Sequence, residues 1–169
     1  MGLYIYTQNL TELALFALAG LLLWFGLCLL LREKRFFRPA CSVLALASLY
    51  IILRFSVIGR ATGGPRHFVF AVTETNEFVR ELFMNVLLYL PFGMAFSVLA
   101  GGWAVPTGFL ISFVIEAWQY LAGAGTAQGT DVICNTLGSV IGALPWIMTL
   151  YITRRHDPSW INRNSSPSS

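Results

Sequence analysis

Five polar side chains with acid, base or amide chemistry lie inside long apolar runs of this sequence. They are Asn85, Glu116, Gln119, Asp131 and Asn135. A carboxyl group in apolar surroundings is a candidate general acid or base, and Glu116 with Asp131 is the pair that these residues offer. Amides and carboxylates together also suit a site that binds a polar headgroup, so chemistry and binding are both considered.

Other familiar catalytic arrangements are poorly supported. The histidines, His67 and His156, are expected on opposite sides of a membrane, and the sequence lacks P-loop, GxSxG and HExxH motifs. Cys28, Cys41 and Cys134 lie in apolar runs without CxxC spacing, which predicts buried thiols rather than disulfides or zinc ligands. We therefore expect neither a metal nor a cofactor.

The composition places these polar residues in a lipid environment. The chain has 169 residues, of which 56% are hydrophobic and 11% are charged, and its mean hydropathy is +0.67. Such a chain has too few polar groups to cover a soluble globule of this size. Its net charge of +3 comes from basic residues beside apolar runs, which favours a membrane-orientation signal and excludes a nucleic-acid partner.

Five apolar runs are long enough to cross a bilayer as helices, because a hydrocarbon core of about 30 Å requires roughly 20 residues. We predict an all-α, polytopic membrane bundle that forms one domain over residues 1–152, followed by a disordered cytoplasmic tail at 153–169. The glycine pair at 101–102 predicts a tight hairpin between the third and fourth spans. The predicted spans are 13–31, 39–58, 82–101, 103–121 and 131–152.

Basic residues predict the orientation of this bundle. The residues that follow the first and last runs are Arg32, Lys34, Arg35, Arg38, Arg154, Arg155 and Arg163. Those between the second and third runs are Arg60, Arg66 and Arg80. The positive-inside rule then predicts an external N-terminus, a cytoplasmic C-terminus and an external segment at 59–80. In this orientation all five polar side chains lie toward the outer face.

A charged side chain in a membrane helix needs a partner or a water-filled cavity, because its insertion costs at least about 2.5 kcal/mol. By depth, Arg54 near the outer end of the second span is the predicted partner of Glu116. Gln119 shares a helix face with Glu116 through its three-residue spacing. Two alternatives follow: a network that only stabilises the bundle, or an outward-facing pocket for a headgroup or small ligand. The residues in either case are Arg54, Asn85, Glu116, Gln119, Asp131 and Asn135.

Proline and glycine residues predict how the spans pack. Pro91, in the middle of the third span, removes one backbone hydrogen bond and predicts a kink, with Gly93 close behind it. Gly138 and Gly142 continue the helix face that begins with Asp131. Glycines on such a face allow a neighbouring helix to approach closely, so we expect a helix contact there.

The motifs of the last three runs resemble those of VanZ-like membrane proteins over about residues 78–148. The matching stretches are Asn85-Val-Leu-Leu-Tyr-Leu-Pro91-Phe92-Gly93, Glu116-Ala-Trp-Gln119, and Asp131-Val-Ile-Cys-Asn135-Thr-Leu-Gly138 with Gly142. The resemblance implies a multi-pass protein of the bacterial cytoplasmic (inner) membrane. The founding member of that family is associated with low-level resistance to the glycopeptide teicoplanin.

One position departs from the resemblance. Many VanZ-like proteins carry an Arg shortly before the Asp of the last motif, and residues 122–130 contain none. If that Arg binds an anionic group, the chain must use another basic residue for it or lack the activity. The basic residues available on the same side are Arg54, Arg60, Arg66 and Arg80.

Three functions are compatible with these residues. The first is an envelope protein that binds a lipid-linked or amphiphilic ligand at an outer-leaflet pocket, surrounded by membrane lipids. The second is a non-catalytic assembly partner of another membrane protein. The third is an intramembrane enzyme that uses Glu116 and Asp131 as acid and base. The arrangement of Arg54 with carboxylates and amides at one depth favours the first.

Overall fold

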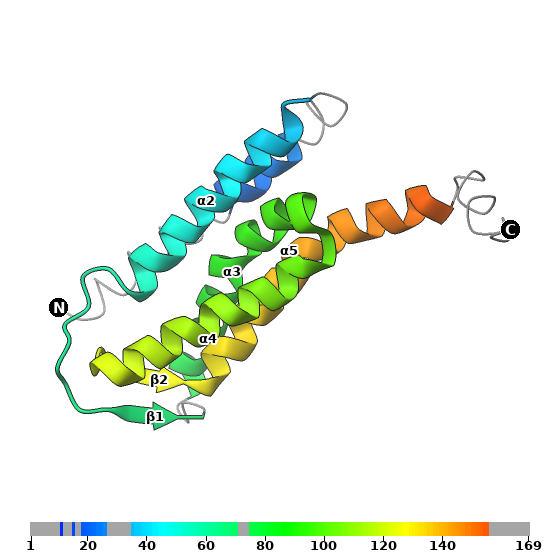
Figure 1. The fold of residues 1–169 in the computed structure, drawn as a ribbon. Coiled ribbons are helices and arrows are strands. Elements are labelled where there is room, and N and C mark those ends of the chain that lie inside the picture. Colours follow the sequence, from blue (N-terminus) through cyan, green and yellow to red (C-terminus); the bar gives the residue numbers. More distant parts are fainter. Residues whose placement is uncertain (1–10, 12–14, 16–17, 27–34, 71–74, 156–169) are drawn as a thin grey trace, which may run out of the picture.

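The computed structural model describes residues 11, 15, 18–26, 35–70 and 75–155 as a bundle of helices (Figure 1). In chain order the elements are α2 (Phe37–Ser56), β1 (His67–Val69), α3 (Thr75–Ala100), the 3₁₀ helix η1 (Gly101–Trp103), α4 (Ala104–Ala122), β2 (Thr126–Gln128) and α5 (Gly129–Arg155). Within the first predicted span, residues 18–26 are helical. The rest of that span, apart from residue 15, and positions 156–169 of the predicted tail lie outside the described residues.

Three of the described stretches are long and apolar enough to cross a membrane: Phe37–Ser56, Val79–Ala122 and Gly129–Ile152. The middle stretch has 44 residues, and as one straight helix it would be about 66 Å long, twice the thickness of a hydrocarbon core. The chain instead reverses at η1, where Gly101 has a φ of 58° that favours glycine. The two halves, α3 and α4, form the predicted hairpin (Figure 1).

Helix α3 lies at the centre of the bundle, and α5 packs against it more extensively than any other element. A Cβ atom added to Gly138 would collide with the backbone of Val86, and Gly142 stands in the same relation to the next turn of α3. From the other side, Gly93 faces the backbone of Ser139. Glycines on both helices therefore bring the two backbones together, which is how small residues act in membrane bundles.

Apolar side chains fill the remaining space around α3. The cluster between α2, α3 and α4 contains Ile52, Leu88, Tyr89, Phe92 and Ile115. Near the other end of the bundle, Phe37 and Cys41 of α2 pack with Val98 of α3. Helix α3 continues through Pro91, which is fully buried, and the kink expected there stays a prediction. The central helix is thus fixed on several faces.

A short parallel sheet ties the segment after α2 to the connection between α4 and α5. Its register pairs His67 with Thr126, Phe68 with Ala127 and Val69 with Gln128. Backbone hydrogen bonds extend the contact on both sides, from Gly63 N to Ala122 O at 2.8 Å and from Thr130 N to Phe70 O at 2.9 Å. The structure is mostly helical, as predicted, and this small sheet is an addition that was not predicted. Strands of three residues are too short to show an alternating pattern in a sequence.

The two ends of the bundle differ in character. At one end, Arg38 near the start of α2 donates a hydrogen bond from Nη2 to the carbonyl oxygen of Leu99 at 3.2 Å. At the opposite end, the sheet lies where α2 and α4 finish and where α5 begins (Figure 1). The polar residues singled out from the sequence belong to this second end.

Candidate functional site

A polar cavity of about 340 Å³ opens at the sheet end of the bundle, between α2, α3, α4 and α5. Of the residues singled out from the sequence, those that line it are Asn85, Glu116, Gln119, Asp131 and Asn135. The sequence motifs thus meet in one cavity although they lie on three helices. Further polar residues line the same space: Ser56, Arg60, Arg80, Glu81, Thr126 and Gln128.

Asn85 and Asp131 join α3 to α5 at the cavity wall. The Asn85 Nδ2 group donates a hydrogen bond to Asp131 Oδ1 at 2.7 Å. Asp131 stands in the first turn of α5, where a negative charge interacts favourably with the helix dipole. The carboxylate therefore has two stabilising partners and still presents its second oxygen, Oδ2.

Glu116 of α4 is 8% exposed, so it needs hydrogen-bonding partners inside the protein. Its Oε2 atom accepts a hydrogen bond from the backbone N–H of Gln128 at 2.8 Å. Gln128 is the last residue of β2, and the bond therefore holds the sheet against α4. This partner is a backbone amide, which composition and spacing do not reveal.

Gln119, one turn from Glu116 on α4, connects to the end of α2. Its Nε2 group donates a hydrogen bond to the carbonyl oxygen of Ser56 at 3.1 Å. Ser56 is the last residue of α2, and the final carbonyl groups of a helix lack partners within the helix. The Gln119 side chain thus closes the α2 end of the cavity wall.

Asn135 lies one helical turn below Asp131 and is 6% exposed. Its Nδ2 group donates a hydrogen bond to Ser112 Oγ at 2.8 Å. Its Oδ1 atom is buried without a hydrogen-bond partner within the described part of the chain. A buried acceptor without a donor costs about 1–3 kcal/mol. Because Asn135 also lines the cavity, a bound donor would relieve this cost.

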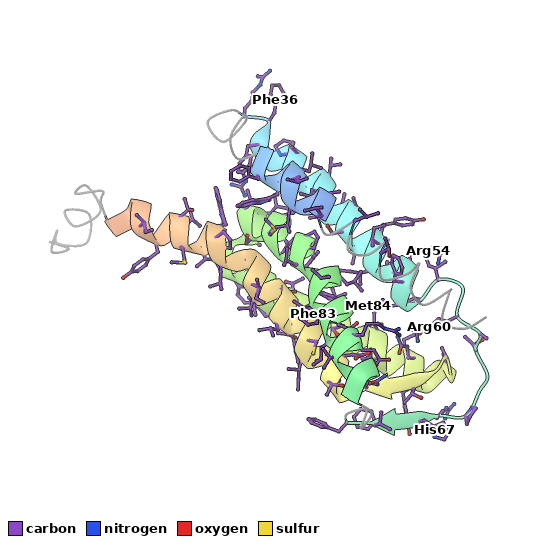
Figure 2. The ribbon with its side chains drawn as sticks, turned by 180° about the vertical axis from the view of Figure 1, so that it is seen from behind. Phe36, Arg54, Arg60, His67, Phe83 and Met84 are labelled. Carbon is purple, nitrogen blue, oxygen red and sulfur yellow. The ribbon has the colours of Figure 1, made fainter. Side chains whose placement is uncertain are left out.

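The expected pairing of Arg54 with Glu116 is wrong. Arg54 is exposed on α2 and does not line the cavity, whereas Arg60 and Arg80 do. In Figure 2 Arg54 extends away from the other helices, and Arg60 extends from the loop toward the α4 side. The Arg60 Nη1 group is 3.5 Å from the carbonyl oxygen of Ala124, in the segment that lacks an Arg of its own. Two residues at the same depth in the membrane need not face each other. The direction in which a side chain leaves a helix changes by about 100° from one residue to the next.

An apolar cleft of about 400 Å³ adjoins the polar cavity. The strand β1 and its following residue contribute Phe68 and Phe70, and the walls on α4 and α5 include Phe113, Ala117 and Val132. Glu116 and Gln128 line both spaces, so one polar wall separates them. A site with one charged and one apolar compartment has the chemical division of an amphiphile.

A comparison with protein-family models gives the same family as the sequence motifs. The model of the VanZ/LLP1 family matches residues 21–151. The match therefore extends well before the resemblance at 78–148 and includes α2, the sheet segment and part of the first predicted span. No curated protein and no solved structure matches the chain significantly.

Proposed function

The chain belongs to the VanZ/LLP1 family, and we propose that it binds an amphiphile, with the polar headgroup in the polar cavity and the hydrocarbon chain in the apolar cleft. The observation that carries this proposal is the wall shared by the two spaces, Glu116 and Gln128. A molecule seated across this wall can place charged and apolar parts in matching surroundings at the same time.

The size and lining of the cavity support a headgroup site. A volume of about 340 Å³ falls at the small end of the range of about 300–1,000 Å³ typical of ligand pockets. Two arginines and three carboxyl groups line it, and charged groups in membrane helices commonly mark a ligand or ion pathway. Hydrocarbon chains of the bilayer can reach the cleft directly, since Phe68 and Phe70 are exposed.

The orientation of the chain supports an outer-leaflet location. Arg35 and Arg38 lie at the end of the bundle opposite the cavity. With these residues in the cytoplasm, the cavity faces the cell exterior. We infer five spans, an external N-terminus and a cytoplasmic C-terminus in the bacterial cytoplasmic membrane. There the site meets lipid-linked envelope precursors and lipoglycopeptides, which connects the proposal to the glycopeptide resistance associated with the family.

A second candidate function rests on two of the same residues. Glu116 and Asp131 line one cavity, and each retains a carboxylate oxygen outside its described hydrogen bond. This arrangement favours acid and base chemistry on a bound headgroup. Mass spectrometry of lipids incubated with the purified protein would detect such a reaction. Lipids of unchanged mass would leave binding as the function.

The binding proposal is tested by photo-crosslinking with a phospholipid that carries a diazirine in one acyl chain. We expect adducts on Phe113 and Val132 to exceed those on Phe83, which is 63% exposed on α3 and contacts bulk lipid. Ala117→Trp fills the cleft and should lower the cleft adducts by about tenfold or more. Leu121→Trp, on the exposed face of the same helix, is the matched control. Equal labelling of the cleft and of Phe83 would overturn the proposal.

A further inference from the structure

Donors and acceptors lie at different depths in the polar cavity. Asn135 is four residues below Asp131 on α5, a step of about 6 Å, and Glu116 is three residues below Gln119 on α4, a step of about 4.5 Å. At the mouth, Arg60 belongs to the loop after α2, and Arg80 lies on α3 more than one turn nearer to the start of that helix than Asn85. The deep part is therefore rich in acceptors, and the mouth carries both guanidinium groups together with the carboxyl group of Glu81.

The deep acceptors have capacity for a ligand. Asn135 Oδ1 is buried without a donor among residues that the structure describes. The hydrogen bond described for Glu116 uses Oε2, and the one described for Asp131 uses Oδ1. Oε1 of Glu116 and Oδ2 of Asp131 lie outside these two bonds. An ammonium group carries three N–H donors and no acceptor. Its three donors equal these three acceptor atoms in number.

The balance of charged groups in the cavity also favours a cationic ligand group. The carboxyl groups that line the cavity, on Glu81, Glu116 and Asp131, outnumber its guanidinium groups, on Arg60 and Arg80. An unbalanced carboxylate at membrane depth is costly unless a cation accompanies it. A ligand that brings its own cation stabilises the deep carboxylates, whereas a purely anionic headgroup adds repulsion there.

We propose that the ligand carries an aminoalkyl phosphate whose primary ammonium group lies against Asn135, Glu116 and Asp131. This proposal rests on the headgroup site proposed above. The phosphate then lies at the mouth, where the guanidinium groups of Arg60 and Arg80 face it, since guanidinium groups bind phosphate oxygens strongly.

The test compares two phospholipids that differ only in whether the headgroup amine is free or acetylated. Phosphatidylethanolamine and N-acetyl-phosphatidylethanolamine with identical acyl chains are titrated into the detergent-solubilised full chain, and bound lipid is counted by native mass spectrometry. We expect the free amine to bind at least about tenfold more tightly. This comparison uses the native chain and depends on no variant. Equal binding of both lipids would overturn the ammonium assignment and leave amphiphile binding intact, whereas binding of neither would overturn both.

A variant pair assigns the preference to the cavity. Glu116→Gln keeps the shape of the side chain and removes its charge, so the preference for the free amine should fall to about twofold or less. Arg54→Gln, at the same end of the bundle but outside the cavity, should keep the preference. A preference that survives unchanged in Glu116→Gln would contradict the assignment of the ammonium to this carboxylate.

Soluble phosphoethanolamine separates the two sources of this headgroup chemistry. We expect no displacement of the lipid by millimolar phosphoethanolamine, because the free compound lacks the chain that fills the apolar cleft. Displacement at micromolar concentration would assign the site to the free aminoalkyl phosphate instead of the lipid. Either result supports recognition of the ammonium and phosphate pair, and failure of both compounds to bind would overturn it.

Discussion

Asn85 Nδ2 on α3 donates a hydrogen bond to Asp131 Oδ1 on α5 at 2.7 Å. This bond stands at the cavity end of the helix pair that packs most extensively in the bundle. A few turns along the same interface, Gly142 contacts the backbone of α3 directly. The polar and the glycine residues of the motifs thus lie on the same interface between α3 and α5. The polar residues lie at its cavity end, and the glycine lies further inside the bundle.

The hydrogen bond predicts a coupled loss of stability. Asn85→Leu should lower the free energy of unfolding by about 1–3 kcal/mol, because the Asp131 carboxylate loses its side-chain donor. Unfolding in mixed detergent micelles would measure it. The double variant Asn85→Leu with Asp131→Leu should cost less than the sum of the single variants, since no unpaired group remains. Strict additivity would show that the two side chains do not interact.

The glycine contacts predict that a single methyl group is harmful at one position and harmless at another. Gly138→Ala places a Cβ atom against the backbone of Val86, so the helices must separate, at a cost of about 1–3 kcal/mol. Gly138→Leu should be more destabilising. Gly102→Ala is the matched control, because a Cβ there meets no atom within 4 Å. Equal thermal stability of the Gly138 and Gly102 variants in detergent would contradict the packing.

The family and the membrane class could be predicted from the sequence, because span length and motif spacing are local properties. The similar depth of Asn85, Glu116 and Asn135 was predicted from their positions along the helices, whereas depth alone does not show that the three side chains line one cavity. The role of Arg60 could not be predicted, because it depends on where a loop places one side chain. Sheet pairing between β1 and β2 joins segments that are distant in sequence and too short to show periodicity.

Orientation in the membrane predicts unequal labelling of two exposed positions. In a chain whose native cysteines are replaced by alanine, Ala61→Cys should react with an impermeant maleimide in intact cells, since Ala61 is exposed in the loop at the cavity end. Trp103→Cys lies at the other end and is 73% exposed, and it should react only after the membrane is opened. The reverse pattern would invert the topology and place the cavity in the cytoplasm.

The cavity lining predicts that two nearby arginines differ in function. Arg60→Gln should weaken the binding of a phosphate-containing lipid by about tenfold, because it removes a guanidinium group from the cavity mouth. Arg54→Gln should change binding by less than about twofold, because Arg54 lies outside the cavity. Lipid titration of both variants in the same detergent would measure the difference. Equal losses would mean that the arginines act only through the general charge of this face.

The central claim is that the polar cavity holds the headgroup of an amphiphile, and two neighbouring residues of α3 test it most directly. Met84 lines the cavity, whereas Phe83 is exposed to lipid, and Figure 2 labels both. Native mass spectrometry of protein released from membranes would count the lipids retained by Met84→Trp, Phe83→Trp and the unaltered chain. We predict that the unaltered chain and Phe83→Trp each retain one lipid, which Met84→Trp loses because its larger side chain fills the cavity. Equal lipid retention by all three proteins would contradict the account.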